Sequence, residues 1–184
     1  MTPAVLWQAA AHLLAYPDER FWRRLPLIEE AAAPHFGAFL ARAAALGPGE
    51  LAAHYVETFD LQRRCCLYLT YYTDGDTRRR GESLAALKAR YRAAGWELLE
   101  DELPDFLPVL LEFAALDPAG VALLREHRAG LELLRAALAE RGSPYADVVG
   151  AVCDGLPPAT AADRDRAARL AAAGPPAESV GVYR

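Results

Sequence analysis

Isoleucine occurs once in this chain, at Ile28, and the other β-branched residues are sparse. Alanine, leucine, arginine and glutamate, which favour helices, dominate instead. Strands are built mainly from β-branched and aromatic residues, so a chain of this composition has little material for a sheet. The sequence therefore predicts an all-α protein, folded as a compact, single-domain bundle of several helices.

Proline, glycine and capping residues mark where the predicted helices begin and end. Thr2-Pro3 starts a first helix, Pro17-Asp18 ends it, and Asp18 can cap the next helix. Pro26 predicts a kink or a new start within that second helix. Gly47-Pro48-Gly49 is a clear break, and a further helix carrying Tyr55 and Phe59 follows it.

The second half of the chain divides in the same way. The turn at 74–77 is expected to cap a helix that ends at Gly95. Further helices are predicted over 107–116, along one long stretch from about 121 to 138, over 145–153 and over 159–173. The apolar run 65–72 fits either a buried helix or a strand. A helix is the interpretation preferred here, because no second candidate strand exists to pair with it.

Composition also shifts near Gly155, where Leu156-Pro157-Pro158 reads as a linker. We expect a helical domain over residues 1–154 and a proline-linked C-terminal tail over 155–184. The last stretch of the tail, 174–184, is expected to be disordered.

Charge and cysteine content limit the possible classes of function. A net charge of -5 with a pI near 5.4 argues against a broad nucleic-acid surface and is compatible with a basic peptide partner. The three cysteines have no chelating spacing and fit a reduced, cytoplasmic setting. The first residues make a poor signal peptide, and no apolar run approaches the ~20 residues of a membrane span.

The segment from Tyr55 to Gly81, YVETFDLQRRCCLYLTYYTDGDTRRRG, mixes acidic, basic and aromatic residues in a way that neither a core nor a solvent face explains. Such local conflicts tend to occur where function overrides folding rules. Arg78-Arg79-Arg80 begin a predicted helix, where the helix dipole disfavours cations. They form either a solvated basic patch or a set of ion pairs with Asp74, Asp76, Glu57 or Asp60.

Two further acidic groups are candidates for a site. Glu57 and Asp60 share a helical face. They either pair with Arg63 or Arg64 or recognise a cationic peptide, since no nucleophile or metal ligand accompanies them. Asp105 is placed to cap the helix that begins near Leu107. The four histidines show no ligand spacing, and no phosphate-binding or nucleophile motif occurs, so we expect no enzyme activity, no metal and no cofactor.

The long segment above, followed by LKARYRAAG and ELPDFLPVLLEFAAL, closely resembles the respiratory nitrate reductase assembly chaperones, the NarJ family, a branch of the TorD-like chaperones of molybdoenzymes. The segment Leu6–Asp18 also fits. The resemblance implies a TorD-like helical fold and no enzyme activity. It implies binding to the N-terminal peptide of the apo nitrate reductase alpha subunit before molybdenum cofactor insertion and membrane docking. The family usually has a histidine where this chain has Phe106, so roles of that histidine do not carry over.

The expected binding site is an apolar groove with an acidic rim, suited to an amphipathic, basic helix. The candidate residues are Tyr55, Glu57, Phe59, Asp60, Leu67, Leu69, Tyr71, Tyr72, Asp76, Arg78, Glu102, Pro104, Asp105, Leu107 and Leu110. A second hypothesis is that the tail makes a separate contact with the client. The chain is expected to be a monomer or weak dimer that meets the membrane only through that client. The alternative is a helical chaperone or adaptor for another molybdoenzyme.

Overall fold

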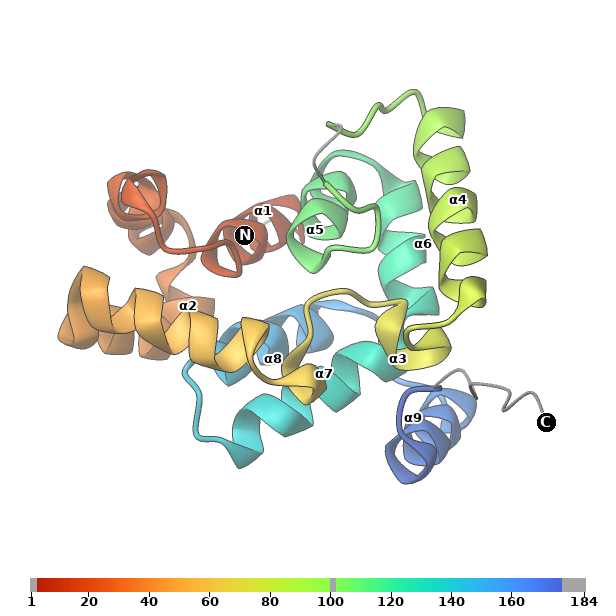
Figure 1. Ribbon diagram of the computed structural model, residues 1–184. Coiled ribbons are helices and arrows are strands. Elements are labelled where there is room, and N and C mark those ends of the chain that lie inside the picture. Colours follow the sequence, from red (N-terminus) through yellow and green to blue (C-terminus); the bar gives the residue numbers. More distant parts are fainter. Residues whose placement is uncertain (1–2, 100–101, 177–184) are drawn as a thin grey trace.

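The computed structural model describes residues 3–99 and 102–176, and this part of the chain is almost wholly helical (Figure 1). The predicted all-α class is confirmed. The helices are α1 (Pro3–Leu13), α2 (Glu19–Tyr55), α3 (Tyr71–Asp74), α4 (Arg78–Ala93), α5 (Leu107–Leu116), α6 (Pro118–Glu126), α7 (Arg128–Glu140), α8 (Tyr145–Gly155) and α9 (Ala161–Ala173). A π-helical turn, η1 (Val56–Asp60), and a short 3-10 turn, η2 (Arg63–Cys65), follow α2. No described helix is long and apolar enough to cross a membrane.

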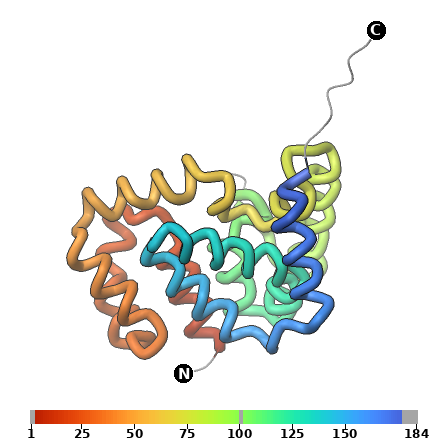
Figure 2. The backbone as a smooth tube through the Cα atoms, turned by 90° about the horizontal axis from the view of Figure 1, so that it is seen from below, coloured from red at the N-terminus to blue at the C-terminus, as the bar shows by residue number. Residues whose placement is uncertain are grey.

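The bundle is organised around α1, α5 and α8. Helix α1 packs against α5 and α8, α2 also packs against α8, and α7 lies between α8 and α9 (Figures 1 and 2). The largest fully buried side chains are aromatic: Trp7, Phe21, Phe36, Phe39 and Tyr145. Since aromatic side chains bury large areas in specific orientations, they fix how the helices meet.

Helix α1 begins at Pro3 and α2 directly after Asp18, as predicted, whereas α1 already ends at Leu13, ahead of Pro17-Asp18. The Asp18 carboxylate accepts the backbone N–H of Phe21 at 2.9 Å and caps α2. The predicted kink or new start at Pro26 is wrong, because the chain runs helically through it. The backbone leaves helical geometry at Gly47, with φ 74°, where the break was predicted. Glycine populates such positive φ values readily, which explains why the break falls there.

The end of α2 widens into the π-helical turn η1. The Leu61 N–H bonds to the Val56 carbonyl oxygen at 3.1 Å, five residues back. Turns of this kind are rare and frequently occur at functional sites. Here the turn buries Phe59 and leaves Glu57 and Asp60 exposed.

The predicted helix over 65–72 is wrong. The chain leaves η2 in an extended conformation at Cys66 and returns to helix only at α3. The extended piece pairs with residues 105–107, because Leu69 N–H bonds to the Asp105 carbonyl at 3.0 Å and Leu107 N–H bonds to the Leu67 carbonyl at 2.8 Å. The partner was missed because it is an irregular loop ahead of α5, joined through a single antiparallel bridge, Tyr68 with Phe106.

The predicted long helix over 121–138 is also wrong, because it is two helices, α6 and α7, with His127 between them. The His127 ring Nδ1 lies 3.0 Å from the Leu123 carbonyl oxygen, which it can satisfy at the end of α6. Apolar periodicity continues across this junction and hid the break.

The remaining helix positions are confirmed. The predicted cap of α4 by the turn 74–77 is wrong, because Thr77 at the cap position makes no side-chain cap bond and donates instead to the Asp74 carbonyl oxygen at 2.7 Å. Helix α5 spans 107–116 and α4 ends before Gly95, which has φ 81°. Helices α8 and α9 lie where expected, and α9 carries a capping box in which Thr160 and Asp163 bond reciprocally. Helix α9 has no buried residue. The predicted cap at Thr2 and most of the predicted disordered end, 177–184, lie outside the described residues.

Candidate functional site

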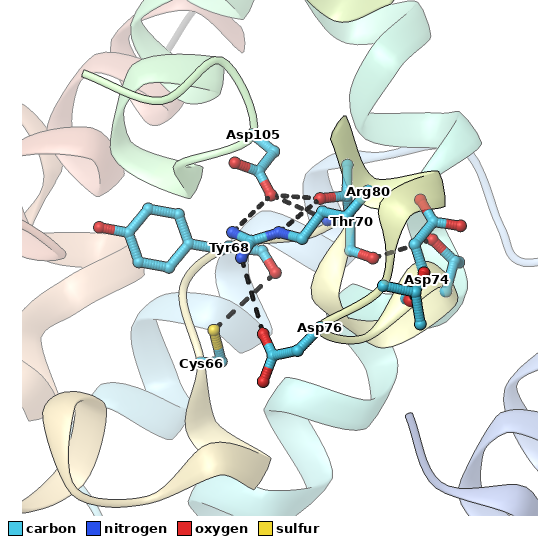
Figure 3. Close-up of polar contacts among 9 residues, drawn as sticks. Cys66, Tyr68, Thr70, Asp74, Asp76, Arg80 and Asp105 are labelled. Carbon is cyan, nitrogen blue, oxygen red and sulfur yellow. Dashed lines mark hydrogen bonds and ion pairs between the residues drawn. The ribbon is translucent and has the colours of Figure 1, made fainter. Parts of the chain in front are cut away.

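Asp105 is the centre of a polar network that joins three segments of the chain (Figure 3). Its side chain is fully buried, and Oδ2 accepts the Thr70 backbone N–H at 3.2 Å and the Thr70 hydroxyl at 2.5 Å. The Arg80 guanidinium lies 3.6 Å from the same oxygen. The predicted capping role of Asp105 is therefore wrong: α5 has Phe106 at its cap position without a side-chain bond, and Asp105 turns toward Thr70 instead.

The carboxylates around the network explain how a helix can begin with three arginines. Arg80 lies 3.9 Å from Asp76 as well as near Asp105, and its Nε–H donates to the Thr70 hydroxyl at 3.3 Å. Arg79 lies 3.9 Å from the buried Asp74. The predicted pairing with Asp74 and Asp76 is confirmed, and Asp105 is a partner that the sequence did not suggest.

Glu57 and Asp60 take no part in that network. Arg64 pairs with Glu140 of α7 at 3.1 Å. No ion pair joins Glu57 or Asp60 to Arg63 or Arg64 within residues 3–99 and 102–176. Both carboxylates are exposed, and peptide recognition stays a prediction for them.

Tyr72 also holds the extended piece between η2 and α3 in place. Its hydroxyl lies 3.1 Å from the Arg64 carbonyl oxygen and 3.0 Å from the Cys66 carbonyl oxygen, and donates its proton to them. The ring is 5% exposed, and burial raises the pKa of Tyr72. Much of the segment Tyr55–Gly81, which stood out in the sequence, is therefore buried and connects α3, α4 and the segment before α5.

The structure divides the fifteen predicted binding residues by burial. Ten are buried: Tyr55, Phe59, Leu67, Leu69, Tyr71, Tyr72, Pro104, Asp105, Leu107 and Leu110. Five are exposed: Glu57, Asp60, Asp76, Arg78 and Glu102. The buried ones shape the surface from beneath, and a contact with a client stays a prediction for all fifteen.

A cleft of about 480 Å³ opens between the start of α2, the end of α1, α5 and the loop after α4. Eight large apolar side chains are exposed in the described chain, and four of them line this cleft: Tyr16, Trp96, Leu99 and Leu116. Exposed apolar groups gathered in a concave site mark an interaction surface more reliably than scattered ones.

Charged side chains surround the apolar lining. Four carboxylates line the cleft, from Asp18, Glu97, Glu102 and Glu112, against the two guanidinium groups of Arg20 and Arg24. The balance is −4 + 2 = −2, so the cleft favours a cationic occupant. Glu102 is the one predicted binding residue that lines it.

Tyr55 contacts the cleft residue Tyr16 from within the core. The Tyr55 hydroxyl donates to the Leu14 carbonyl at 3.1 Å, and its ring meets that of Tyr16 edge-on, with centroids 5.5 Å apart. Burial raises the pKa of Tyr55, and the charges of Asp60 and Glu102 add to the effect. The carboxylates of Asp60 and Glu102, 42 residues apart in sequence (102 − 60), therefore act on the same tyrosine beside the cleft.

His12 contributes an unusual polar atom to the cleft. Its ring stacks on Phe21, with centroids 5.7 Å apart, and its Nε2 is buried with no hydrogen-bond partner in the structure. Burial lowers the pKa of His12, and the nearby Arg24 and Arg20 act in the same direction. The lowered pKa favours the neutral ring, which suits a nitrogen buried without a partner.

The thiols offer no reactive site. Cys65 and Cys153 are buried, Cys66 is half-buried, and all three are free. Burial raises the pKa of each thiol, that of Cys153 to about 12, so the nucleophilic thiolate is disfavoured. Within the described ranges, no three metal-ligating side chains cluster.

Sequence reasoning missed most of the cleft. Its lining comes from helix ends and loops that are distant in sequence, including His12, Tyr16, Trp96 and Leu116. A signal existed for two of them, since Tyr16 directly precedes Pro17-Asp18 and Leu116 directly precedes Asp117-Pro118. A large apolar residue at a helix end is easily read as the last residue of the core face.

Comparisons with known proteins agree with the resemblance. The family model described as nitrate reductase delta subunit matches residues 24–150. The nitrate reductase-like protein NarX of Mycobacterium tuberculosis is 44% identical over 155 residues, covering 81% of this chain, and this chain spans 24% of its length. The Bacillus subtilis protein named as a probable nitrate reductase molybdenum cofactor assembly chaperone NarJ is 34% identical, with 79% of this chain and 84% of that protein covered.

The fold also has a relative of known structure. The crystal structure of a redox enzyme maturation protein from Archaeoglobus fulgidus superposes with a TM-score of 0.66 at 21% identity. The match covers 82% of this chain and 91% of that one. At this identity the likeness concerns the fold, and it bears out the expected TorD-like bundle.

Proposed function

The chain belongs to the nitrate reductase delta subunit family, and from this premise we propose that it is an assembly chaperone of a nitrate reductase, acting before molybdenum cofactor insertion is complete. The Bacillus subtilis NarJ relative is named as an assembly chaperone and not as an enzyme. This supports the expectation that the chain catalyses no reaction, and the protonated thiols are consistent with it. The proposed location is the cytoplasm, where an apoenzyme is assembled.

The client segment that we propose is the N-terminal peptide of the catalytic alpha subunit. The observation that carries this proposal is the cleft, which combines half of the exposed large apolar side chains of the described chain with net negative charge. An amphipathic helix with basic residues satisfies both features, as in other helix-in-groove complexes. Tyr16 and Trp96 are the proposed anchors, since aromatic side chains give large contact area with few rotatable bonds.

The predicted binding residues have two roles in this proposal. Glu102 faces the client directly, and Asp60 adds to the acidic rim beside Tyr55. The buried residues, with Asp105 among them, hold the extended piece and the start of α5 in place and so fix one wall of the cleft. Preorganisation of this kind lowers the cost of binding.

A second contact with the client is proposed for α9. This helix is outside the matched residues 24–150, and none of its side chains is buried. Arg166 and Leu170 of α9 face a hollow of about 520 Å³ that α4 and the α6–α7 junction complete. Because α9 buries none of its side chains, it is available to bind the surface of another protein. The chaperone itself is proposed to be a monomer or weak dimer.

Calorimetric titration of the full chain with the N-terminal peptide of the alpha subunit encoded beside it tests the proposal. Saturable binding is expected, weakened about tenfold or more by Leu116→Ser, since burying a leucine contributes roughly 1.5–3 kcal/mol. Leu27→Ser is the matched control, because Leu27 is 66% exposed, compared with 62% for Leu116, and does not line the cleft. Equal affinity for both variants would show that the peptide binds elsewhere.

The alternative is a different molybdoenzyme as client. The same titration with N-terminal peptides of other molybdoenzymes of the same organism distinguishes the two. Tighter binding to one of those peptides would identify another molybdoenzyme as the client, with the cleft still as the proposed binding site.

A further inference from the structure

The cleft does not end at α5 but continues along the seam between α1 and α5. A second hollow of about 410 Å³ is lined by the first turns of α1, including Pro3 and Trp7, and by the junction of α5 and α6. Leu116, which is 62% exposed, lines both hollows. The two hollows therefore meet at this side chain.

The two hollows share one face of α1. The α1 residues of the second hollow are Pro3, Ala4 and Trp7, and those of the cleft are Ala11 and His12, with Ala15 and Tyr16 just beyond the helix. Positions 4, 7, 11 and 15 follow the spacing of three and four residues that defines one helical face. Along α5 the order is reversed: Pro108 and Val109 line the cleft, and Ala115 lines the second hollow. The helices α1 and α5 are thus antiparallel, and the groove follows their seam.

The length of the seam matches a short helix. Helix α1 has 11 residues, which at about 1.5 Å per residue is roughly 16 Å, or three turns. An occupant of about three turns would lie on α1 and α5 as a third helix, with Leu116 near its middle.

The two ends of the groove differ in electrostatic character. The cleft end carries the net charge of −2 given above. At the other end Arg125 and Asp117 balance, 1 − 1 = 0, and Asp117 is already engaged with the Ala119 N–H at 2.8 Å and the Trp96 indole at 3.4 Å. The dipoles of the antiparallel helices α1 and α5 oppose one another at each end of the groove, so the difference comes from the charged side chains. The potential therefore becomes more positive from the cleft to the start of α1.

We propose that this groove holds the client peptide as a three-turn helix with a fixed direction: its basic N-terminal turn lies in the cleft by Trp96, and its C-terminal turn lies by Trp7 and the start of α1. The bound helix runs parallel to α5 and antiparallel to α1. A helix has a positive N-terminal end, so this direction places that end against the acidic cleft, whereas the reverse direction places the negative C-terminal end there. The inference rests on the proposed function, because it assumes that the occupant is a peptide of the client.

Two backbone amides give the experiment its reporters, since Leu98 lines only the cleft and Trp7 only the second hollow. The full chain, labelled with ¹⁵N, is mixed with the alpha-subunit N-terminal peptide carrying a nitroxide near its first or its last residue. The first peptide is expected to broaden the amide signal of Leu98 more strongly than that of Trp7. The second peptide is expected to do the opposite.

A charge variant supplies the matched control. Glu97→Lys with Glu112→Lys removes the negative end of the groove, and the contrast between the two labelled peptides should diminish. Glu50→Lys, on α2 and outside both hollows, should leave it unchanged. Reversed broadening, or equal broadening of both amides by either peptide, overturns the proposed direction while leaving the client assignment in place. Absence of any saturable binding overturns the proposed function itself.

Discussion

Asp105 accepts the hydroxyl proton of Thr70 at 2.5 Å across 35 positions of sequence, with both side chains almost wholly buried. The bond joins the segment before α3 to the segment before α5, and Arg80 of α4 closes the network. The other carboxylate oxygen of Asp105, Oδ1, is buried without a hydrogen-bond partner in the structure. The position of the loop that forms one wall of the cleft therefore depends strongly on one side chain.

Thr70→Val should destabilise the fold by about 1–3 kcal/mol, because it removes a donor and leaves a buried carboxylate with fewer partners. The free energy of unfolding in urea measures this. Thr73→Val is the control, since the half-buried Thr73 hydroxyl donates only to the Thr70 carbonyl at 3.1 Å, and a smaller loss is expected. If both variants lower the free energy of unfolding equally, the Asp105 network contributes no more to stability than the Thr73 hydrogen bond.

The stability of the protein should fall as pH falls below neutrality. Burial lowers the pKa of His54 from the ordinary value of 6.5, with Arg141 and Arg42 acting in the same direction. Between the lowered pKa and 6.5 the unfolded chain binds more protons, so stability is full above 6.5 and is lost as pH falls through the folded-state value. His12 is shifted in the same direction and adds to the loss.

His54→Gln should therefore reduce the slope of stability against pH between about 7.5 and 5, as measured by thermal unfolding at several pH values. His54 Nε2 lies 2.9 Å from the Ser143 hydroxyl, and glutamine keeps a polar group there. His35→Gln, at an exposed position, should leave the slope as in the wild type. A slope unchanged by His54→Gln would assign the pH dependence to other groups.

Reversing the acidic side of the cleft should slow association with the peptide. Glu102→Lys with Glu112→Lys changes two cleft carboxylates into cations, and the association rate constant should fall on the order of tenfold at low salt. Stopped-flow fluorescence at several salt concentrations measures it, and the decrease in rate with added salt should become weaker. Arg20→Glu, in the same cleft, should change the rate in the opposite direction.

Removal of α9 should spare the bundle and the cleft. A chain that ends at Pro158 keeps the buried Leu156 and the Pro157 carbonyl, which accepts from Arg128 at 3.1 Å. Its stability should change by about 1 kcal/mol or less, as for surface changes outside the core. Peptide affinity should stay the same, whereas the yield of active client should fall. A chaperone ending at Pro158 that is fully active in maturation would leave α9 without a client contact.

Several elements could be predicted from sequence because short-range rules decide them. Asp18 caps α2 as expected, Gly47 and Gly95 lie at helix breaks with positive φ, and α5 spans the predicted residues. In each case the deciding contacts lie within a few residues, so local propensity and capping are sufficient. Asp74 and Asp76 were predicted as partners of the arginine triplet for the same reason.

The errors have the opposite origin. The run 65–72 is extended because its backbone groups bond to residues 105–107, and Asp105 fails to cap α5 because Thr70 and Arg80 are its partners. Local sequence contains no information on which distant segment will satisfy a buried carboxylate. Tertiary contacts override local propensity in such places.

By itself, the sequence determined the helical class, most helix boundaries and the resemblance to one chaperone family, because these depend on composition, local pattern and a contiguous motif. Only the tertiary structure decided which residues of that motif are core and which are surface. It also brought Tyr16, Trp96 and Leu116 from three separate segments into one cleft. A binding surface is made by packing between elements, and the residues that line it need share no spacing along the chain.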